Sequence, residues 1–372
     1  MKRFCLLAFI FPAGLAAQER SFMWTDRYVL GTELHLSADL TFADVDGDGD
    51  MDALVAHGRH WPQPNEVYLN NGRARFTVSY QLGSRSATTY AVPAGDLDGD
   101  GDVDVVVAND LAQNWVYLND GIGQFTPAWP VGPEVEPTRS AQLYDLDSDG
   151  DLDVLVTNRG ASNGLFLNDG TGRFGSKREF GESDGSTIAV AVGDVNADGH
   201  PDLVLANRDG QANQVLINDG RLGFVDGIRY GTGSDETRSA AVGDLNGDGH
   251  LDIVNANIGE PNRIYLGDGT GAFDYGTSVG DDEQSYALAL VDVDRDGDTD
   301  VVVANVRARN EVYLNDGSGV AWVRMPIGEE AYTTYGLDVS DLNGDGFEDL
   351  GFANSSGPNL IFLNIEAGSR QE

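Results

Sequence analysis

Seven acidic loops of the pattern D-x-[DN]-x-D-G-x-x-D recur along this chain, each directly before an apolar run. Their first residues are Asp44, Asp96, Asp145, Asp194, Asp244, Asp292 and Asp341. Successive loops lie 48 to 52 residues apart, so a single structural unit is repeated seven times. This period constrains the fold strongly, because such units bury their apolar faces by stacking on their neighbours.

Each unit has the pattern of four short strands. In residues 86–132, apolar runs lead into Asp96, follow the acidic loop at Val105, return at Trp115 and begin again at Phe125. Gly/Asn/Asp turns separate them, which predicts an antiparallel sheet, and the lack of a 3.6-residue period predicts almost no helix. We therefore expect an all-β, seven-bladed β-propeller with four-stranded antiparallel blades, since the coils of a parallel β-helix are far shorter.

The two ends of the chain complement each other. After Asp341 there is room for two further strands, at 348–353 and 360–364, while residues 22–31 form a spare strand before the first loop. We expect this N-terminal strand to pair with the strand at 360–364, completing the last sheet and closing the ring.

Residues 1–17 read as a signal peptide, with Lys2 and Arg3 before an apolar stretch and small residues at its end. Residues 18–372 are then a single propeller domain, secreted to an extracellular or periplasmic location. The only cysteine, Cys5, lies in the leader. A net charge of −38 disfavours nucleic acid and anionic membranes as partners, because the long-range field repels phosphates. We expect no membrane insertion and a monomeric chain.

The acidic loops have the chemistry of calcium sites. Alternating carboxylate or amide oxygens around a sharp glycine bend suit a hard cation that takes six to eight oxygen ligands. The residue after the glycine would contribute its backbone carbonyl. We expect about seven Ca²⁺, one per loop, held by Asp44, Asp46, Asp48, Asp50 and Asp52; Asp96, Asp98, Asp100, Asp102 and Asp104; Asp145, Asp147, Asp149, Asp151 and Asp153; Asp194, Asn196, Asp198, His200 and Asp202; Asp244, Asn246, Asp248, His250 and Asp252; Asp292, Asp294, Asp296, Asp298 and Asp300; and Asp341, Asn343, Asp345, Phe347 and Asp349. Crowding so many carboxylates would make calcium a folding ligand.

These repeats resemble a known family. The segments AGDLDGDGDVDVVVANDLAQNWVYLNDGIGQF and VGDLNGDGHLDIVNANIGEPNRIYLGDGTGAF are similar to the FG-GAP/VCBS repeats of the integrin α-subunit propeller and of bacterial secreted proteins. The resemblance implies calcium in the loop between the first two strands, and partners on the opposite face of the ring. Members of this family serve in adhesion, as sugar-binding lectins and as modules of polysaccharide-degrading enzymes, so the resemblance is specific for the fold and for calcium and not for the function.

Departures from the repeat point to a ligand site in the first unit. Most units carry an Asn 13 residues after the opening Asp, but His57 stands there in the first, followed by an enlarged loop. Its residues His57, Arg59, His60 and Trp61 are the expected ligand-binding residues, because aromatic stacking and guanidinium donors suit carbohydrate or peptide. Neighbouring loops would add Arg85, Tyr90, Arg139, Arg238, Tyr286, Arg307, Arg309, Tyr332 and Tyr335. A plain surface variant with solvated arginines is the alternative.

Three functions remain open at this point. The first is a secreted, calcium-stabilised module for adhesion to, or binding of, a glycan or a protein partner. The second is a secreted lyase or hydrolase acting on an acidic polysaccharide, with His57 or His60 as base. The third is a purely structural assembly protein. We expect no catalytic residues, because no nucleophile motif, cofactor loop or carboxylate pair stands apart from the calcium loops.

Overall fold

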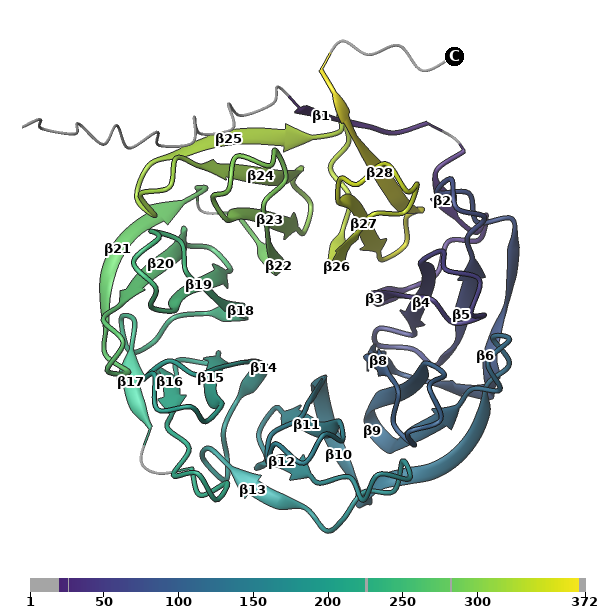
Figure 1. Cartoon of the computed structure of the whole chain (residues 1–372), viewed down its shortest axis with the longest axis horizontal. Coiled ribbons are helices and arrows are strands. Elements are labelled where there is room, and N and C mark those ends of the chain that lie inside the picture. Colours follow the sequence, from purple (N-terminus) through teal and green to yellow (C-terminus); the bar gives the residue numbers. More distant parts are fainter. Residues whose placement is uncertain (1–19, 26, 225–226, 282, 368–372) are drawn as a thin grey trace, which may run out of the picture.

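The computed structural model describes residues 20–25, 27–224, 227–281 and 283–367. Every regular element in these ranges is a β-strand. The sheets stand side by side in a ring around a central axis, and the chain runs once around it (Figure 1). The all-β propeller architecture expected from the repeats is therefore confirmed. The expected signal peptide, residues 1–17, lies outside the described residues.

Four sheets contain four antiparallel strands each, and each of them is built from one repeat. Their strands are β3 (Ser37–Ala43), β4 (Asp52–His57), β5 (Gln63–Leu69) and β6 (Val78–Ala87); β14 (Thr187–Gly193), β15 (Asp202–Asn207), β16 (Asn213–Leu216) and β17 (Ile228–Tyr230); β18 (Thr237–Gly243), β19 (Asp252–Asn257), β20 (Asn262–Gly267) and β21 (Phe273–Val279); and β22 (Ser285–Val291), β23 (Asp300–Asn305), β24 (Asn310–Asn315) and β25 (Trp322–Ile327). In each sheet the first strand lies nearest the central axis (Figure 1).

The expectation of seven separate four-stranded blades is wrong. The described strands form six sheets, of which only five have the four or five strands of an individual blade. The sixth sheet has seven strands: β7 (Thr89–Ala91), β8 (Ala94–Gly95), β9 (Asp104–Leu118), β10 (Thr126–Tyr144), β11 (Asp153–Asn158), β12 (Asn163–Phe166) and β13 (Arg178–Phe180). The physical reason is that β9 and β10 continue through segments that are loops in the other repeats, where Ala112 pairs with Glu136 and Asp110 with Pro137.

The N-terminal segment also differs from the expectation. Instead of one strand over residues 22–31, two short strands, β1 (Arg20–Met23) and β2 (Val29–Leu30), pair with β28 (Asn359–Glu366). Together with β26 (Thr334–Ser340) and β27 (Asp349–Asn354) they form a five-stranded sheet. Ring closure by a single N-terminal strand is therefore not what the structure shows.

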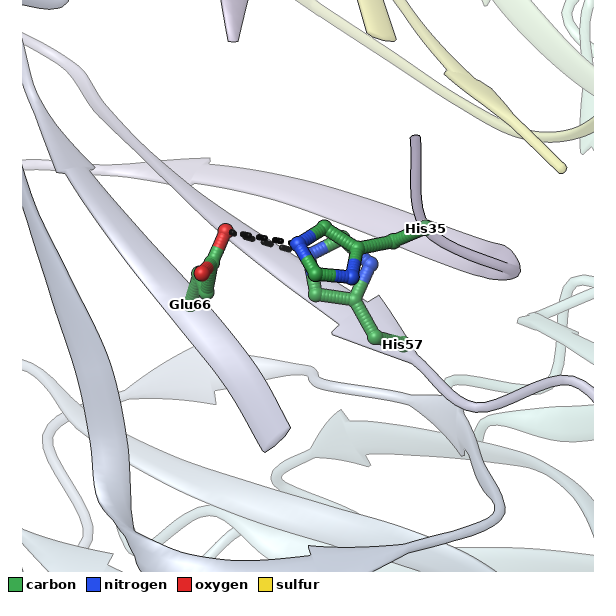
Figure 2. A group of neighbouring side chains, drawn as sticks. All are labelled: His35, His57 and Glu66. Atoms are coloured by element: carbon green, nitrogen blue, oxygen red, sulfur yellow. Dashed lines mark ion pairs between the residues drawn. The ribbon is translucent and has the colours of Figure 1, made fainter. Parts of the chain in front are cut away.

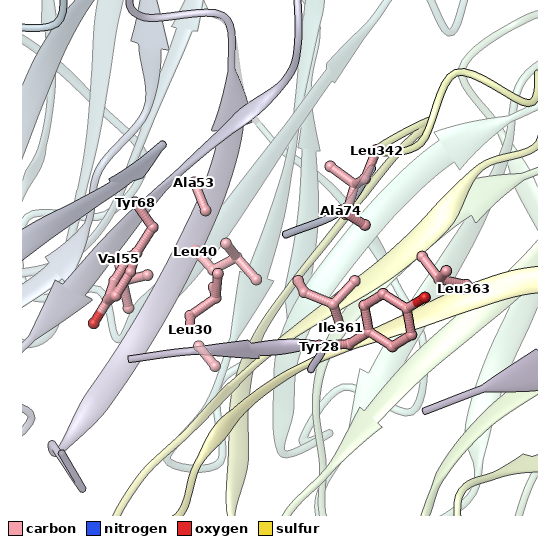
Figure 3. Packing of buried hydrophobic residues seen from close by; sticks show 11 residues of the cluster. Tyr28, Leu30, Leu40, Ala53, Val55, Tyr68, Ala74, Leu342, Ile361 and Leu363 are labelled. Carbon is pink, nitrogen blue, oxygen red and sulfur yellow. The ribbon is translucent and has the colours of Figure 1, made fainter. Parts of the chain in front are cut away.

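The first and last repeats also meet along their innermost strands. The backbone N–H of Phe42 in β3 donates to the carboxylate of Asp338 in β26 at 2.7 Å. Beside these strands, an apolar cluster combines Tyr28 and Leu30 with Leu40 of the first repeat and Ile361 of the last (Figure 3). The contact between the chain ends thus rests on packing of buried apolar side chains as well as on strand pairing.

The second strand of most repeats forms the core. All six residues are buried in β4, β11, β15, β19, β23 and β27. These strands read as near-continuous runs of Val, Leu, Ile and Ala because both faces of each sheet pack against a neighbouring sheet. The core is therefore distributed around the ring as several apolar clusters, which leaves the axis free for polar side chains.

Asparagines at the turn after the third strand link neighbouring repeats. The Nδ2 group of Asn119 donates to the carbonyl of Val45, the second residue of the preceding repeat's acidic loop. Five such bonds of 2.7–2.8 Å occur among the described residues: Asn70 to Leu342, Asn119 to Val45, Asn168 to Leu97, Asn315 to Leu245 and Asn364 to Val293. No equivalent bond is described for Asn218, and Gly267 has no side chain to make one.

Candidate functional site

One register position of the innermost strands faces the axis in every repeat. A buried Ser or Thr stands at or near the start of each of these strands, except that Thr138 lies within the long strand β10, and the next residue lines a common cavity of about 330 Å³. These lining residues are Ala38, Tyr90, Arg139, Ile188, Arg238, Tyr286 and Tyr335. Since the acidic loops follow the other ends of the same strands, the cavity lies at the end of the strands away from those loops.

Arg59 is the most unusual side chain of this cavity. It comes from the enlarged first-repeat loop, where Gly58 takes φ 97°, and a Cβ there would lie 2.3 Å from the carbonyl of Ala87. The Arg59 side chain is only 6% exposed, and its Nη2 donates to the Tyr286 hydroxyl at 2.5 Å. Its guanidinium stacks over the Tyr335 ring at 3.4 Å, with the Tyr286 ring 4.6 Å away. Packing against aromatic faces stabilises a cation whose water has been removed.

The other arginines of the cavity have carboxylate partners, and Arg59 has none among the described residues. The pairs are Arg139 with Asp110 (2.7 Å), Arg159 with Asp209 (2.9 Å), Arg208 with Asp209 (3.0 Å) and Arg238 with Glu236 (3.2 Å). The Nε atoms of Arg59 and Arg238 are buried without a hydrogen-bond partner. Burying a guanidinium without an anionic partner costs free energy. An anion that enters this cavity would offset that cost.

The cavity also changes the ionisation of its neutral side chains. Burial alone would raise the pKa of the Tyr286 hydroxyl, but the charges of Arg59 and Arg238 outweigh it and lower that pKa. Burial, followed by the charge of Arg59, lowers the pKa of His60. His60 is therefore a neutral imidazole at neutral pH, which can accept a proton.

The acidic loops form a second group of polar sites at the opposite end of the innermost strands. In the first loop, the carboxylate of Asp44 accepts the backbone N–H groups of Gly47 (2.8 Å) and Gly49 (3.0 Å). The ninth residue, Asp52, is fully buried and accepts from the N–H groups of Val45 (3.1 Å) and Asn70 (2.7 Å). The ninth Asp makes the same two bonds in all seven loops. It therefore joins the loop to the turn after the third strand.

The loop carboxylates fit a hard cation. In the loops that begin at Asp44, Asp96, Asp145 and Asp292, three carboxylate oxygens lie within 4.8 Å of one another. Burial and the neighbouring charge of Asp48 raise the pKa of Asp46, as expected for negative charges without a counterion. In the sixth loop, Oδ1 of Asp292 is buried without a partner. An all-oxygen donor set of this kind is what Ca²⁺ prefers.

Comparison with known families identifies the repeat. Six overlapping segments match the FG-GAP-like repeat: residues 44–107, 96–156, 145–205, 194–255, 244–303 and 292–352. The chain belongs to the FG-GAP repeat family. The resemblance noted from the sequence is thereby confirmed, and each matched segment runs from one acidic loop through the next repeat's second strand.

Solved structures similar to this FG-GAP chain share its fold at low sequence identity. A chain of the crystal structure of BBS1N in complex with ARL6DN, soaked with lead, superposes with a TM-score of 0.63 and 12% identity. The same complex soaked with mercury gives 0.63 and 13%. Both alignments cover 96% of this chain and 100% of the other. None of the curated proteins compared with the chain matches it.

The sequence-predicted ligand residues separate into two groups in the FG-GAP structure. Arg59 and His60 line the axial cavity, whereas Trp61 is 71% exposed and does not line it. His57 is fully buried and faces away toward Glu66. Of the expected neighbours, the cavity contains Tyr90, Arg139, Arg238, Tyr286 and Tyr335 but not Arg85, Arg307, Arg309 or Tyr332.

Sequence reasoning missed four charged residues of the cavity: Asp39, Asp110, Arg159 and Arg208. A signal for three of them was present, because Asp110, Arg159 and Arg208 each directly follow the recurrent Asn of their repeat. Aligning all repeats on that Asn would have placed these side chains at one level of the ring. The regular elements of the described chain include no helix long and apolar enough to cross a membrane.

Asp39 should make the stability of the protein depend on pH. Burial, and to a lesser extent the charge of Asp338, raises the pKa of Asp39 to about 7. Its stabilising contribution is therefore complete below about pH 4 and is lost as the pH rises through 7. Asp39→Asn should raise the melting temperature relative to the parent at pH 8 and change it little at pH 4. The exposed Asp274→Asn is the matched control, and an equal shift of Asp39→Asn at both pH values would contradict the expectation.

The chemistry of the two sites differs clearly. The axial cavity offers guanidinium, phenol and imidazole groups to an anionic ligand, while the loops offer carboxylates to a cation. Both sit on the ends of the same strands, so the loops can stabilise the scaffold that positions the cavity.

Proposed function

We propose that this FG-GAP protein is an exported, calcium-stabilised binding module whose axial cavity holds an acidic glycan. The observation that carries the proposal is Arg59, a buried guanidinium without a carboxylate partner among the described residues, open to a cavity of about 330 Å³. Carboxylate and sulfate groups match the planar fork of an arginine. Export is proposed from residues 1–17, and Ca²⁺ from the donor sets of the acidic loops.

The remaining cavity residues suit a sugar ring. Tyr90 and Tyr335 line the cavity, and tyrosine hydroxyls form hydrogen bonds with sugar hydroxyls. The volume is at the lower end of the roughly 300–1,000 Å³ typical of ligand pockets, which is enough for one or two sugar residues. The long-range field of a chain with net charge −38 would oppose association, so binding should depend on the local arginines.

A glycan panel tests the proposal. In saturating Ca²⁺ the protein should bind polymers that carry uronate or sulfate groups, and should not bind neutral polymers. Carboxyl-reduced versions of each uronate polymer are the matched control, since they keep the sugar rings and linkages. Equal binding of the acidic and the reduced polymer, or no binding to any acidic glycan, would refute the proposal.

A lyase acting on the same ligand class is the second candidate. It is favoured by His60, whose pKa is lowered by burial and by Arg59, and by Tyr286, whose pKa is also lowered. In such a reaction His60 would take the proton next to the uronate carboxylate while Arg59 stabilises the charge. The glycosidic oxygen would then leave with a proton from the Tyr286 hydroxyl, and a C=C bond would form in the product. Ultraviolet absorbance, measured during the same glycan panel, detects that bond. If the absorbance does not change, the protein binds the glycan without cleaving it.

A further inference from the structure

A compact group of two histidines and one glutamate lies beside the axial cavity, in the first repeat. His35 precedes β3, His57 ends β4, and Glu66 lies in the middle of β5. Figure 2 shows the two imidazole rings next to each other, with their planes tilted by 33°, and the Glu66 carboxylate facing both. The ring centroids are 4.3 Å apart, and the ligand atoms of the three residues all lie within 4.8 Å of one another.

The distances within this group suit a shared metal ion better than hydrogen bonds. Nε2 of His57 lies 3.5 Å from Oε2 of Glu66, and Nε2 of His35 lies 3.7 Å from the same atom. Both are longer than a normal N–H···O bond, and neither Nε2 has a hydrogen-bond partner although both are buried. Ligands about 2.0–2.1 Å from a tetrahedral Zn²⁺ are separated by about 3.3 Å, close to what is observed.

The surroundings hold the three side chains in place. The hydroxyl of Ser37 lies 3.1 Å from Nδ1 of His57, and His57 itself is 0% exposed. In the tautomer that carries its proton on Nδ1, His57 donates to Ser37 and turns the Nε2 lone pair toward Glu66, as in metal sites with a supporting hydrogen bond. The hydroxyl of Tyr68 donates to Glu66.

Comparison among the repeats shows that the fold does not require a histidine at this position. In other repeats an Asn replaces His57 and hydrogen-bonds the equivalent hydroxyl, as Asn354 does with Thr334 at 2.7 Å. Packing alone is therefore satisfied by Asn, and an imidazole adds a ring nitrogen, Nε2, that has no hydrogen-bond partner among the described residues.

We propose that His35, His57 and Glu66 bind a divalent transition-metal ion of the Zn²⁺ type. Two imidazole nitrogens and one carboxylate oxygen favour Zn²⁺ over the Ca²⁺ that the acidic loops would select. Glu33 is exposed, with an oxygen 3.6 Å from Nε2 of His35, and it or a water molecule completes the coordination.

The metal would connect the segment before β3 to the loop that carries Arg59. Backbone N–H groups of Gly58 and Arg59 already donate to the carbonyl of Leu36, at 3.0 and 2.9 Å. An ion bound by both His35 and His57 would hold in place the two chain segments that these backbone hydrogen bonds connect. The site is therefore structural, and it stands whether or not the axial cavity binds a glycan.

Calorimetric titration with zinc tests the proposal. The full chain, without an affinity tag, is stripped of metals and then saturated with Ca²⁺ so that the acidic loops are occupied. One equivalent of Zn²⁺ should bind. Loss of one supporting hydrogen bond typically weakens metal binding by about 10–100-fold, so loss of a ligand in His57→Asn should weaken it by at least about 100-fold. Co²⁺ should give the intense visible bands of tetrahedral coordination in the parent and not in this variant.

His57→Asn restores the residue used by other repeats, so it should fold and melt like the metal-free parent. Glu66→Gln is the second test, and His200→Ala, an exposed histidine of an acidic loop, is the matched control. The proposal is overturned if no Zn²⁺ binds to the parent, or if His57→Asn and Glu66→Gln bind it as the parent does. A similar loss in His200→Ala would also overturn it, because it would place the ion in the acidic loops.

Discussion

Removing Ca²⁺ should lower the melting temperature of this protein by more than about 10 °C. A ligand at 100 times its Kd stabilises the folded state by about 2.7 kcal/mol per site, and 1 kcal/mol shifts the melting temperature by about 2–4 °C in a domain of 150–250 residues. Seven loops carry ligand sets, so several such contributions add up. Without a cation, burial raises the pKa of Asp52 to about 7 and of Asp349 to about 8, which shows how unfavourable these charges are.

Differential scanning calorimetry before and after treatment with a calcium-selective chelator would measure this shift. Ca²⁺ added back should restore the melt, whereas Mg²⁺, which requires stricter octahedral geometry, should restore it poorly. Elemental analysis should find about seven Ca²⁺, one for each acidic loop. Asp341→Ala should lose one ion, and the exposed Glu330→Gln none. An unchanged melt in the chelator would refute a folding function for calcium.

Replacing Arg59 by methionine should abolish most of the binding of an acidic glycan. Methionine keeps an unbranched side chain between Tyr286 and Tyr335 but removes the charge and the donors. Loss of a buried anchoring side chain costs about 2–4 kcal/mol, which corresponds to about 30- to 1,000-fold in Kd. Stability should not fall, because the variant also removes a buried charge that lacks a carboxylate partner among the described residues.

Isothermal titration with the best acidic ligand, together with a thermal melt, would measure both effects. Arg307→Ala is the matched control, because Arg307 is exposed and does not line the cavity. Arg59→Lys should fall between the parent and Arg59→Met, since lysine keeps the charge without the planar fork. If Arg59→Met binds the acidic ligand as tightly as the parent, the axial cavity is not the binding site.

Most of the architecture could be predicted from the sequence, but less of the candidate site could. Loop spacing and apolar runs predicted an all-β propeller, because the periodicity of burial is visible residue by residue. The sequence could not predict that the pairing of β9 with β10 extends as far as Ala112 and Glu136. This extension depends on local backbone hydrogen bonding, which the side-chain pattern does not indicate. The separate-blade count was wrong for that reason.

At the site, the side chains of the unusual first-repeat loop diverge: Arg59 and His60 line the axial cavity, whereas His57 and Trp61 do not. Side-chain directions in a loop do not follow a regular period. The sequence therefore could not show that Arg59 and His60 line the cavity while Trp61 is exposed. His57, which was predicted to bind a ligand, does not line the cavity, because it occupies the Asn position and is buried against Glu66. His35 was not considered, since only the fold brings it next to Glu66.

The asparagine bonds between neighbouring repeats are unequally distributed, and this gives the ring a preferred place to open. Five junctions carry a bond from a turn Asn to the preceding loop, including the junction of the chain ends through Asn70 and Leu342. The repeat that begins at Asp194 lacks the bond on both sides, since none is described for Asn218 and position 267 is a glycine. Partial unfolding or proteolytic attack would therefore start at this fourth unit.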